Sequence, residues 1–84
     1  MNRILRIIYL DGISRDLQVT ASDIVAFELK FEVALDRIEK FAHICFIAWH
    51  GEKRTKGTDL DFESWLDTIQ MVEFVDDSPK DSKA

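Results

Sequence analysis

Two histidines and a single cysteine are the side chains of this chain best suited to metal binding or nucleophilic catalysis. His43 and His50 are seven residues apart, which places them on the same side of a helix. A zinc site needs a third and usually a fourth ligand. Glu39 lies one turn before His43, but Cys45 falls elsewhere on the helix, so no complete ligand set forms. We therefore expect no metal site, with His43 on a helix flank and His50 near a helix C-terminus, where it favours the dipole.

Cys45 lies within the most apolar run of the chain, and this context argues against a reactive thiol. A buried cysteine in apolar surroundings behaves as a small hydrophobic residue with a raised pKa and low reactivity. The sequence also lacks a Gly-rich phosphate loop, a metalloprotease His-Glu pair and a serine in a nucleophile-elbow context. We therefore expect that the protein is not an enzyme and that it uses no cofactor.

Size and composition indicate a single small domain. A chain of 84 residues is expected to form one domain, and a hydrophobic content of 46% is ample for a packed core. The net charge of −5 argues against general nucleic-acid binding. No window approaches the roughly 18 apolar residues of a membrane span, and the first residues lack the pattern of a signal peptide. A single cysteine allows no internal disulfide, which suits a reducing cytosol.

The most apolar stretch, residues 38–50, is expected to form the central helix of the domain. Its apolar residues cover one stripe at i, i+3, i+4 and i+7 spacing and much of the remaining surface, so other elements must surround it. We predict a helix over residues 35–50 that ends at Gly51, in the position of a C-cap glycine.

The segment before the central helix is expected to contain a β-hairpin over residues 4–19. Leu5, Ile7 and Tyr9 would share one face of the first strand, and the dipeptide Asp11-Gly12 is typical of a tight hairpin turn with positive φ angles. A lone hairpin is marginally stable in water, so it must lay one face on the helices.

A first helix is predicted over residues 21–32. Thr20 and Asp23 have the spacing of a capping box, with aspartate in place of the usual glutamate. Neither glycine nor proline separates this helix from the central one, but a single helix would be too long for a compact domain. We therefore favour a kink or short turn near Val33 and Ala34.

A third helix is predicted over residues 60–71, where large apolar residues recur at the spacing of an amphipathic helix. Residues 72–75 either extend this helix or form a short extended segment, which we favour. Together the elements predict an α+β domain over residues 1–75, in which the hairpin packs on a small, mainly helical bundle of about three α-helices. Residues 76–84 contain no large apolar side chain and are expected to form a disordered acidic tail.

Charged residues follow the central helix and dominate the C-terminal third. Lys53, Arg54 and Lys56 come after Gly51, where cations complement a helix dipole and could also form a basic patch for an acidic partner. From Thr58 onward eight acidic residues stand against two lysines. Such an acidic region aids solubility and could steer the domain toward a basic or apolar partner.

The order and spacing of these features resemble the small tail assembly chaperones of long-tailed bacteriophages. The features span most of the chain and comprise the Asp-Gly hairpin, the helix that opens at Thr20 and reaches Phe31, the apolar helix that closes with Ala48-Trp49-His50-Gly51, the segment Asp61-Phe-Glu-Ser-Trp-Leu-Asp67 and the close from Val72 to Asp77. One departure is Glu32, at a position where such chaperones are associated with a turn glycine.

The resemblance implies a non-structural protein made in the cytoplasm of the infected bacterium and absent from the mature virion. Such chaperones bind the long tape measure protein, keep it soluble and help the major tail protein to polymerise around it. Many are also made in a longer form by translational frameshifting. The resemblance transfers no binding residue, so our partner-binding candidates come from the surface itself: Lys53, Arg54, Lys56 and Phe74. Trp49 and Trp65 are expected in the core, and self-association into a homo-oligomer is open.

Two other classes of function fit the same surface chemistry. The first is a small acidic regulatory or adaptor protein, of the antitoxin or anti-repressor kind, that occupies the active surface of a partner. The second is a structural component of the virion, which would be present in purified particles. Neither class requires a membrane, a nucleic acid or a cofactor.

Overall fold

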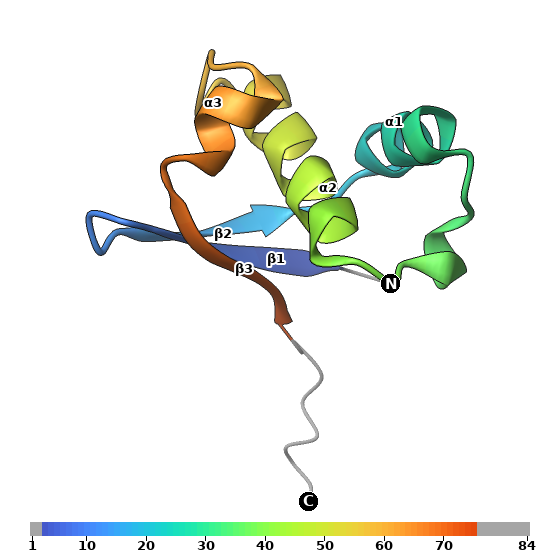
Figure 1. Cartoon of the computed structure of the whole chain (residues 1–84), viewed down its shortest axis with the longest axis horizontal. Coiled ribbons are helices and arrows are strands. Elements are labelled where there is room, and N and C mark those ends of the chain that lie inside the picture. The colour runs from blue at the N-terminus through green and yellow to red at the C-terminus, as the bar shows by residue number, and fades with distance from the viewer. Residues whose placement is uncertain (1–2, 76–84) are drawn as a thin grey trace, which may run out of the picture.

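The computed structural model describes residues 3–75, apart from the side chain of Leu35, and shows an α+β domain of two layers. A three-stranded antiparallel sheet with the order β2-β1-β3 forms one layer. The helices lie together on one face of this sheet, and the other face is uncovered by any described element (Figure 1). The predicted α+β class with three α-helices is therefore confirmed, whereas the predicted lone hairpin is part of a three-stranded sheet. The predicted disordered tail, residues 76–84, lies outside the described residues.

The predicted hairpin is confirmed as β1 (Ile4–Tyr9) and β2 (Ser14–Gln18), which pair in antiparallel register from Ile4 opposite Gln18 to Ile8 opposite Ser14. The turn is longer than the predicted tight turn. Gly12 has a φ of +93°, whereas Asp11 stays at negative φ and its carboxylate accepts a hydrogen bond of 2.9 Å from the Ile13 N–H. The aspartate therefore contributes through its side chain, and the glycine alone supplies the left-handed backbone.

Helix α1 (Ala21–Phe31) begins and ends where the sequence indicates. Thr20 and Asp23 form the predicted capping box, in which the Thr20 N–H donates to Asp23 Oδ2 at 3.0 Å. Glu32 ends the helix in the left-handed conformation, with φ +56° and ψ +39°. The chaperones that the sequence resembles are associated with a glycine at this position. The left-handed backbone observed at Glu32 is one that glycine adopts most readily.

Helix α2 (Phe41–Arg54) is the central helix, but both ends differ from the predicted range 35–50. A short 3₁₀ helix, η1 (Leu35–Arg37), and an extended Lys40 precede it, so the chain turns twice between α1 and α2. Gly51 is inside the helix and is no C-cap. A Cβ atom at Gly51 would overlap the Leu17 side chain, so this glycine lets α2 lie close to β2.

The predicted third helix over residues 60–71 is wrong in its second half. Helix α3 (Phe62–Leu66) is short, and β3 (Ile69–Val75) follows it as a complete strand. Strand β3 pairs with β1 from Tyr9 opposite Ile69 to Ile4 opposite Val75, with an irregularity between Ile8 and Tyr9. The hairpin is thus part of a larger sheet, whose third strand comes from the other end of the chain (Figure 1).

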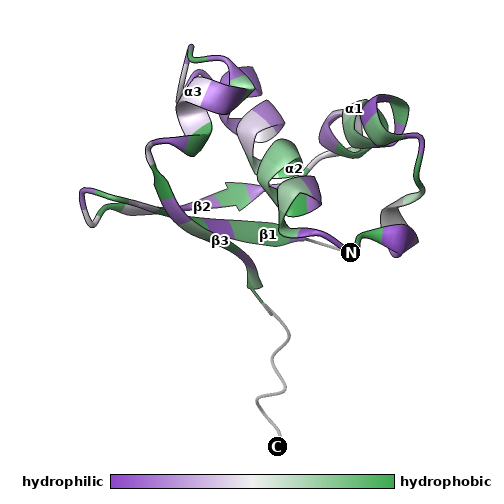
Figure 2. Ribbon diagram, in the orientation of Figure 1, coloured by the Kyte–Doolittle hydropathy of each residue, from purple (hydrophilic) through white to green (hydrophobic). Residues whose placement is uncertain are grey.

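The core lies between the sheet and the helices. Figure 2 shows hydrophobic residues along β1 and along the N-terminal half of α2, and these two elements face each other across the core. The fully or nearly fully buried hydrophobic residues come from all three strands and from α1, α2 and α3: Leu5, Ile7, Leu17, Phe27, Cys45, Phe46, Ile47, Ala48, Trp65 and Val72. Trp65 is 1% exposed, as predicted, and donates from Nε1 to the Tyr9 hydroxyl at 3.2 Å. Trp49 is half-buried, and its Nε1 donates to the Leu60 carbonyl at 2.9 Å.

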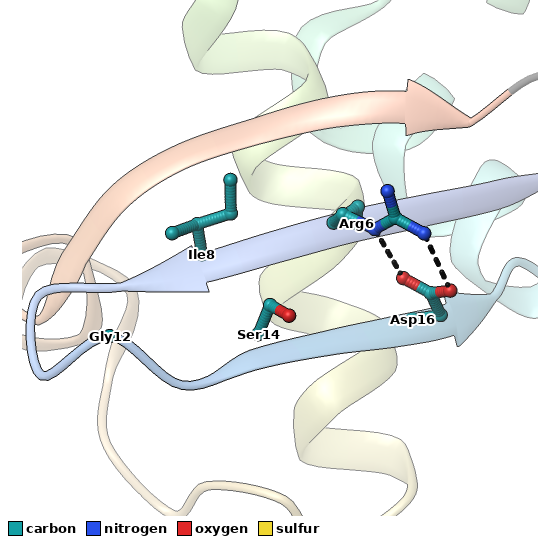
Figure 3. A pocket seen from close by; sticks show the side chains of 5 residues that line it. All are labelled: Arg6, Ile8, Gly12, Ser14 and Asp16. Carbon is teal, nitrogen blue, oxygen red and sulfur yellow. Dashed lines mark hydrogen bonds and ion pairs between the residues drawn. The ribbon is translucent and has the colours of Figure 1, made fainter.

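The uncovered sheet face carries a mixture of apolar and charged side chains (Figure 3). Arg6 lies between the two neighbouring strands and binds Asp16 through Nε and Nη2, at 2.9 and 3.2 Å. Ile8 lies beside it, between Ser14 on β2 and Met71 on β3.

Candidate protein-binding site

The four residues predicted to bind a partner lie at opposite ends of α2. Lys53 and Arg54 form the last turn of this helix, where we had placed a loop, and Lys56 follows in a turn with φ +65°. Phe74 lies near the end of β3, beside the first turns of α2. The structure therefore separates the basic residues from the phenylalanine by roughly the 20 Å length of α2.

Arg54 is exposed, but its guanidinium group pairs with groups of its own domain. Its Nε and Nη2 donate to the carboxylate of Asp23 at 3.1 and 2.8 Å, and Nη2 also donates to the Gln18 carbonyl at 3.2 Å. The Asp23 side chain is completely buried, and His50 Nδ1 lies 2.7 Å from its Oδ1. These contacts join the start of α1, the end of β2 and the last turns of α2. We conclude that Arg54 stabilises the fold and is poorly placed to recognise a partner.

The environment of Asp23 keeps its carboxylate ionised. Burial alone would raise its pKa, but hydrogen bonds from Arg54, from His50 and from the Thr20 backbone together hold the pKa of Asp23 below its usual value. The sequence suggested only the capping role of Asp23. Its pairing with Arg54 and His50 joins residues far apart in the chain, so no local pattern could have indicated it.

Lys53 and Lys56 share a shallow hollow with Gly57, Thr58 and Asp59. The Asp59 carboxylate offsets part of the positive charge there. Lys53 Nζ also lies 5.6 Å from the centre of the Trp49 ring, a cation–π distance. The two lysines remain exposed and form a modest basic surface at the C-terminal end of α2.

Phe74 contributes to a shallow hollow at the other end of α2 that is lined by both apolar and charged side chains, and we call it the Phe74 groove. Its volume is about 450 Å³, and it is lined by Arg3, Ile38, Glu39, Lys40, Phe41, Ile44 and Phe74. Phe41 and Phe74 are 49% and 42% exposed, although both side chains belong to regular elements. Large half-exposed apolar side chains that converge on one hollow are typical of surfaces that bind a partner.

The fold explains why these two phenylalanines remain exposed. Phe74 lies opposite Leu5 on the helix-covered face of the sheet, but it is at the end of β3, where α2 only begins. Phe41 is the first residue of α2 and cannot reach the core beneath the middle of the helix. Both rings therefore border the core without entering it. The sequence pattern identified Phe74 alone, because the groove exists only once β3 has been placed beside α2.

His43 and Cys45, which were considered for metal binding or catalysis, are both buried. His43 is buried, which corrects the predicted helix-flank position: its ring lies 5.3 and 4.8 Å from the ring centres of Phe27 and Phe31, and Nδ1 accepts from the Glu39 N–H at 3.4 Å. Burial raises the pKa of the Cys45 thiol to about 11, so little thiolate exists at neutral pH. Between residues 3 and 75, no three His, Cys, Asp or Glu side chains gather closely enough to hold a metal ion.

Glu52 is a buried carboxylate that the sequence gave no reason to expect inside the domain. Arg15 Nε donates to its Oε2 at 3.0 Å, whereas Oε1 is buried without a hydrogen-bond partner. Gly57 lies directly against Oε1, and a side chain there would overlap it. The Arg15–Glu52 pair joins β2 to the C-terminal half of α2.

The arrangement as a whole offers a binding surface. Among the described residues, no helix combines the length and the apolar character that are needed to cross a bilayer. The Phe74 groove can receive apolar side chains, and Arg3 and Lys40 beside it can contact acidic groups.

Comparison with known proteins adds no relative: no protein-family model, no curated protein and no solved structure matches the chain.

Proposed function

We propose that the protein is a tail assembly chaperone of a long-tailed bacteriophage, which binds the tape measure protein, keeps it soluble and assists tail tube polymerisation. It would act in the cytoplasm of the infected host and leave before the virion is complete. The order and spacing of the sequence features support this identification, since they resemble those of such chaperones. The observation that carries the binding function is the Phe74 groove, with its two half-exposed phenylalanines.

The groove suits an amphipathic helix as its occupant. A helical client presents apolar side chains at i, i+3, i+4 and i+7, and such side chains fill an apolar groove on a partner. A tape measure protein is expected to be long, helical and apolar on one face, so its exposed stripe would aggregate without a cover. Phe41 and Phe74 would provide the apolar contact, and Arg3 and Lys40 would meet acidic residues that flank the stripe.

The test is co-expression with a candidate tape measure protein, followed by a solubility and co-purification assay. The wild-type chain should make the long partner soluble and co-purify with it. The variant Phe41→Gln/Phe74→Thr should lose both effects, because it replaces the exposed rings while keeping acceptable residues for a helix start and a strand.

Leu29→Gln is the matched control, since Leu29 is 76% exposed on α1 and lies outside the groove. Each variant should melt within a few degrees of the wild type, which shows that the fold is intact. If the phenylalanine variant still solubilises the partner, the client binds another surface. If the wild-type chain itself neither solubilises nor binds the partner, the chaperone proposal is wrong, and a regulatory or adaptor function takes its place.

A further inference from the structure

A further hollow of the surface lies between the tip of the hairpin and the segment that joins α2 to α3, and we call it the Tyr9 pocket. Its volume is about 380 Å³, and its lining includes Tyr9, Asp11, Ile13, Arg15, Gly57 and Leu60. It shares no lining residue with the Phe74 groove, which lies at the other end of α2. The Tyr9 pocket is therefore a separate candidate binding site.

A buried carboxylate lies directly behind this pocket. The Glu52 side chain is completely buried and contacts two of the lining residues, since Arg15 Nε donates to Oε2 at 3.0 Å and Gly57 lies against Oε1. Among the described residues, Oε1 has no hydrogen-bond partner. Arg15 thus meets only one of the two oxygens. A charge that is shielded from water also acts more strongly on its surroundings than an exposed one.

The charges around the Tyr9 pocket favour a cation as its ligand. Glu52 and Asp11 contribute two negative charges, against one positive charge from Arg15. The pKa of Tyr9 is raised, most of all by burial, although the hydrogen bond from Trp65 lowers it. The charges of Glu52 and Asp11 raise this pKa further, whereas the charge of Arg15 lowers it. All three charged groups therefore lie close enough to act at the Tyr9 hydroxyl.

The walls of the pocket suit an apolar chain that ends in a hydrogen-bond donor. Ile13 on the hairpin and Leu60 after α2 are 59% and 39% exposed. Deeper in the pocket, the Tyr9 hydroxyl oxygen accepts from Trp65 Nε1 at 3.2 Å and can accept a second hydrogen bond. A lysine side chain combines these properties, because a flexible stem of about four carbons carries an ammonium group with about three donors.

We propose that the Tyr9 pocket binds a lysine side chain that a partner protein presents. The stem of the lysine would pack between Ile13 and Leu60, and its ammonium group would donate to the Tyr9 hydroxyl oxygen. A partner protein fits better than a free amine, because a small ligand would leave much of the apolar rim exposed. The net charge of −5 also attracts a basic surface. The proposal does not depend on the chaperone function.

The test is an NMR titration of the whole chain with Nα-acetyl-lysine N-methylamide, which presents one lysine side chain. Changes in amide chemical shift should concentrate at Tyr9, Ile13 and Leu60. The norleucine analogue differs only by the missing ammonium group and should bind about 10-fold more weakly. Butylamine carries the same charged chain without a peptide backbone. If it binds more tightly than the lysine compound, the ligand is a free amine, and the proposal of a partner lysine is wrong.

Two variants test the role of the carboxylates. Asp11→Asn keeps an acceptor oxygen for the Ile13 N–H and should raise the Kd of the lysine compound about 2- to 5-fold. Glu52→Gln should raise it about 3- to 30-fold, since it removes the buried charge. Asp16→Asn is the matched control, because it removes a carboxylate from the same hairpin outside the pocket. Its Kd should equal that of the wild type, and all three variants should melt close to it.

Several results would overturn the proposal. Shift changes that are absent or spread over the whole surface would show that the Tyr9 pocket is not a lysine site. Equal binding of the lysine and norleucine compounds would exclude recognition of the charge, as would equal weakening by Asp11→Asn and Asp16→Asn. The variant Phe41→Gln/Phe74→Thr should bind the lysine compound like the wild type, so a failure of this proposal is distinct from a failure of client binding.

Discussion

Glu52 shows at the scale of a single residue how a small domain accommodates a carboxylate in its interior. One oxygen is paired with Arg15, and the other faces Gly57, the only residue type that leaves room for it. Buried carboxylates need partners because desolvation is costly. Here the glycine is required by space, since its φ is not in the left-handed region.

Replacing Gly57 with alanine should therefore lower the free energy of unfolding by about 1–3 kcal/mol, as expected for an added group in a filled site. The new methyl group would overlap Glu52 Oε1 and force the carboxylate away from Arg15. Chemical denaturation of the single variant and of the double variant Gly57→Ala/Glu52→Ala would measure this. The double variant should cost less than the sum of the two single changes, because the overlap is gone. Simple additivity would place the strain elsewhere.

The contacts between elements depend on a second buried carboxylate, Asp23, which holds α1, β2 and α2 together through Arg54. Because hydrogen bonds depress the pKa of Asp23 in the folded state, its stabilising contribution is present above the pKa of the unfolded chain, about 4, and is lost as the pH falls through the folded value. Acid should thus loosen the junction where these elements meet.

Arg54→Met should lower the free energy of unfolding by roughly 1–3 kcal/mol at neutral pH, since it leaves a buried carboxylate with fewer donors. The variant should also lose less stability than the wild type between pH 5 and roughly 2, because the depressed pKa depends on Arg54. Denaturation curves across this range would show both effects. Arg6→Met is the comparison, since the Arg6–Asp16 pair is exposed and screened by solvent, so that its loss should lower the stability clearly less. Equal losses in both variants would mean that Asp23 does not depend on Arg54.

Among the helices and strands, the sequence predicted those that depend on a local sequence pattern. The hairpin and α1 follow from the Asp-Gly turn and the capping box, and the end of α1 at Glu32 was expected near Val33. The first half of β3 was assigned to a helix because Ile69 and Val72 fit a helical spacing as well as a strand, whereas the extended segment favoured for residues 72–75 is confirmed. Pairing with β1, far away in the chain, decides between them. The same pairing creates the Phe74 groove, so Phe74 was identified as a candidate while Phe41 and Ile44 were assigned to a helix interior.

The whole domain shares one hydrophobic core, and Trp65 connects its two layers. Its ring is buried between α3 and the sheet and meets the Tyr9 ring edge-on, with ring centres 6.4 Å apart. Small domains keep only a few kcal/mol of net stability, so the loss of one such side chain affects the entire fold.

Trp65→Ala should cost about 3–5 kcal/mol and leave the chain largely unfolded at 37 °C. Trp49→Ala is a suitable comparison, because Trp49 is half-buried and the change should cost clearly less. Circular dichroism during thermal unfolding would separate the two. A Trp65 variant that melts at the wild-type temperature would show that the core tolerates the cavity.

The position of β1 in the middle of the sheet has a consequence for the timing of folding. One neighbour of β1 follows it at once in the chain, but the other, β3, is near the end of the described residues. Contacts between such distant segments form late, since a long loop must close before they are gained. During synthesis the ribosome releases the first strand well before its final neighbour exists. The nascent chain therefore carries an incomplete sheet until residues 69–75 have been made, and a product that stalls before them would expose the apolar face of β1.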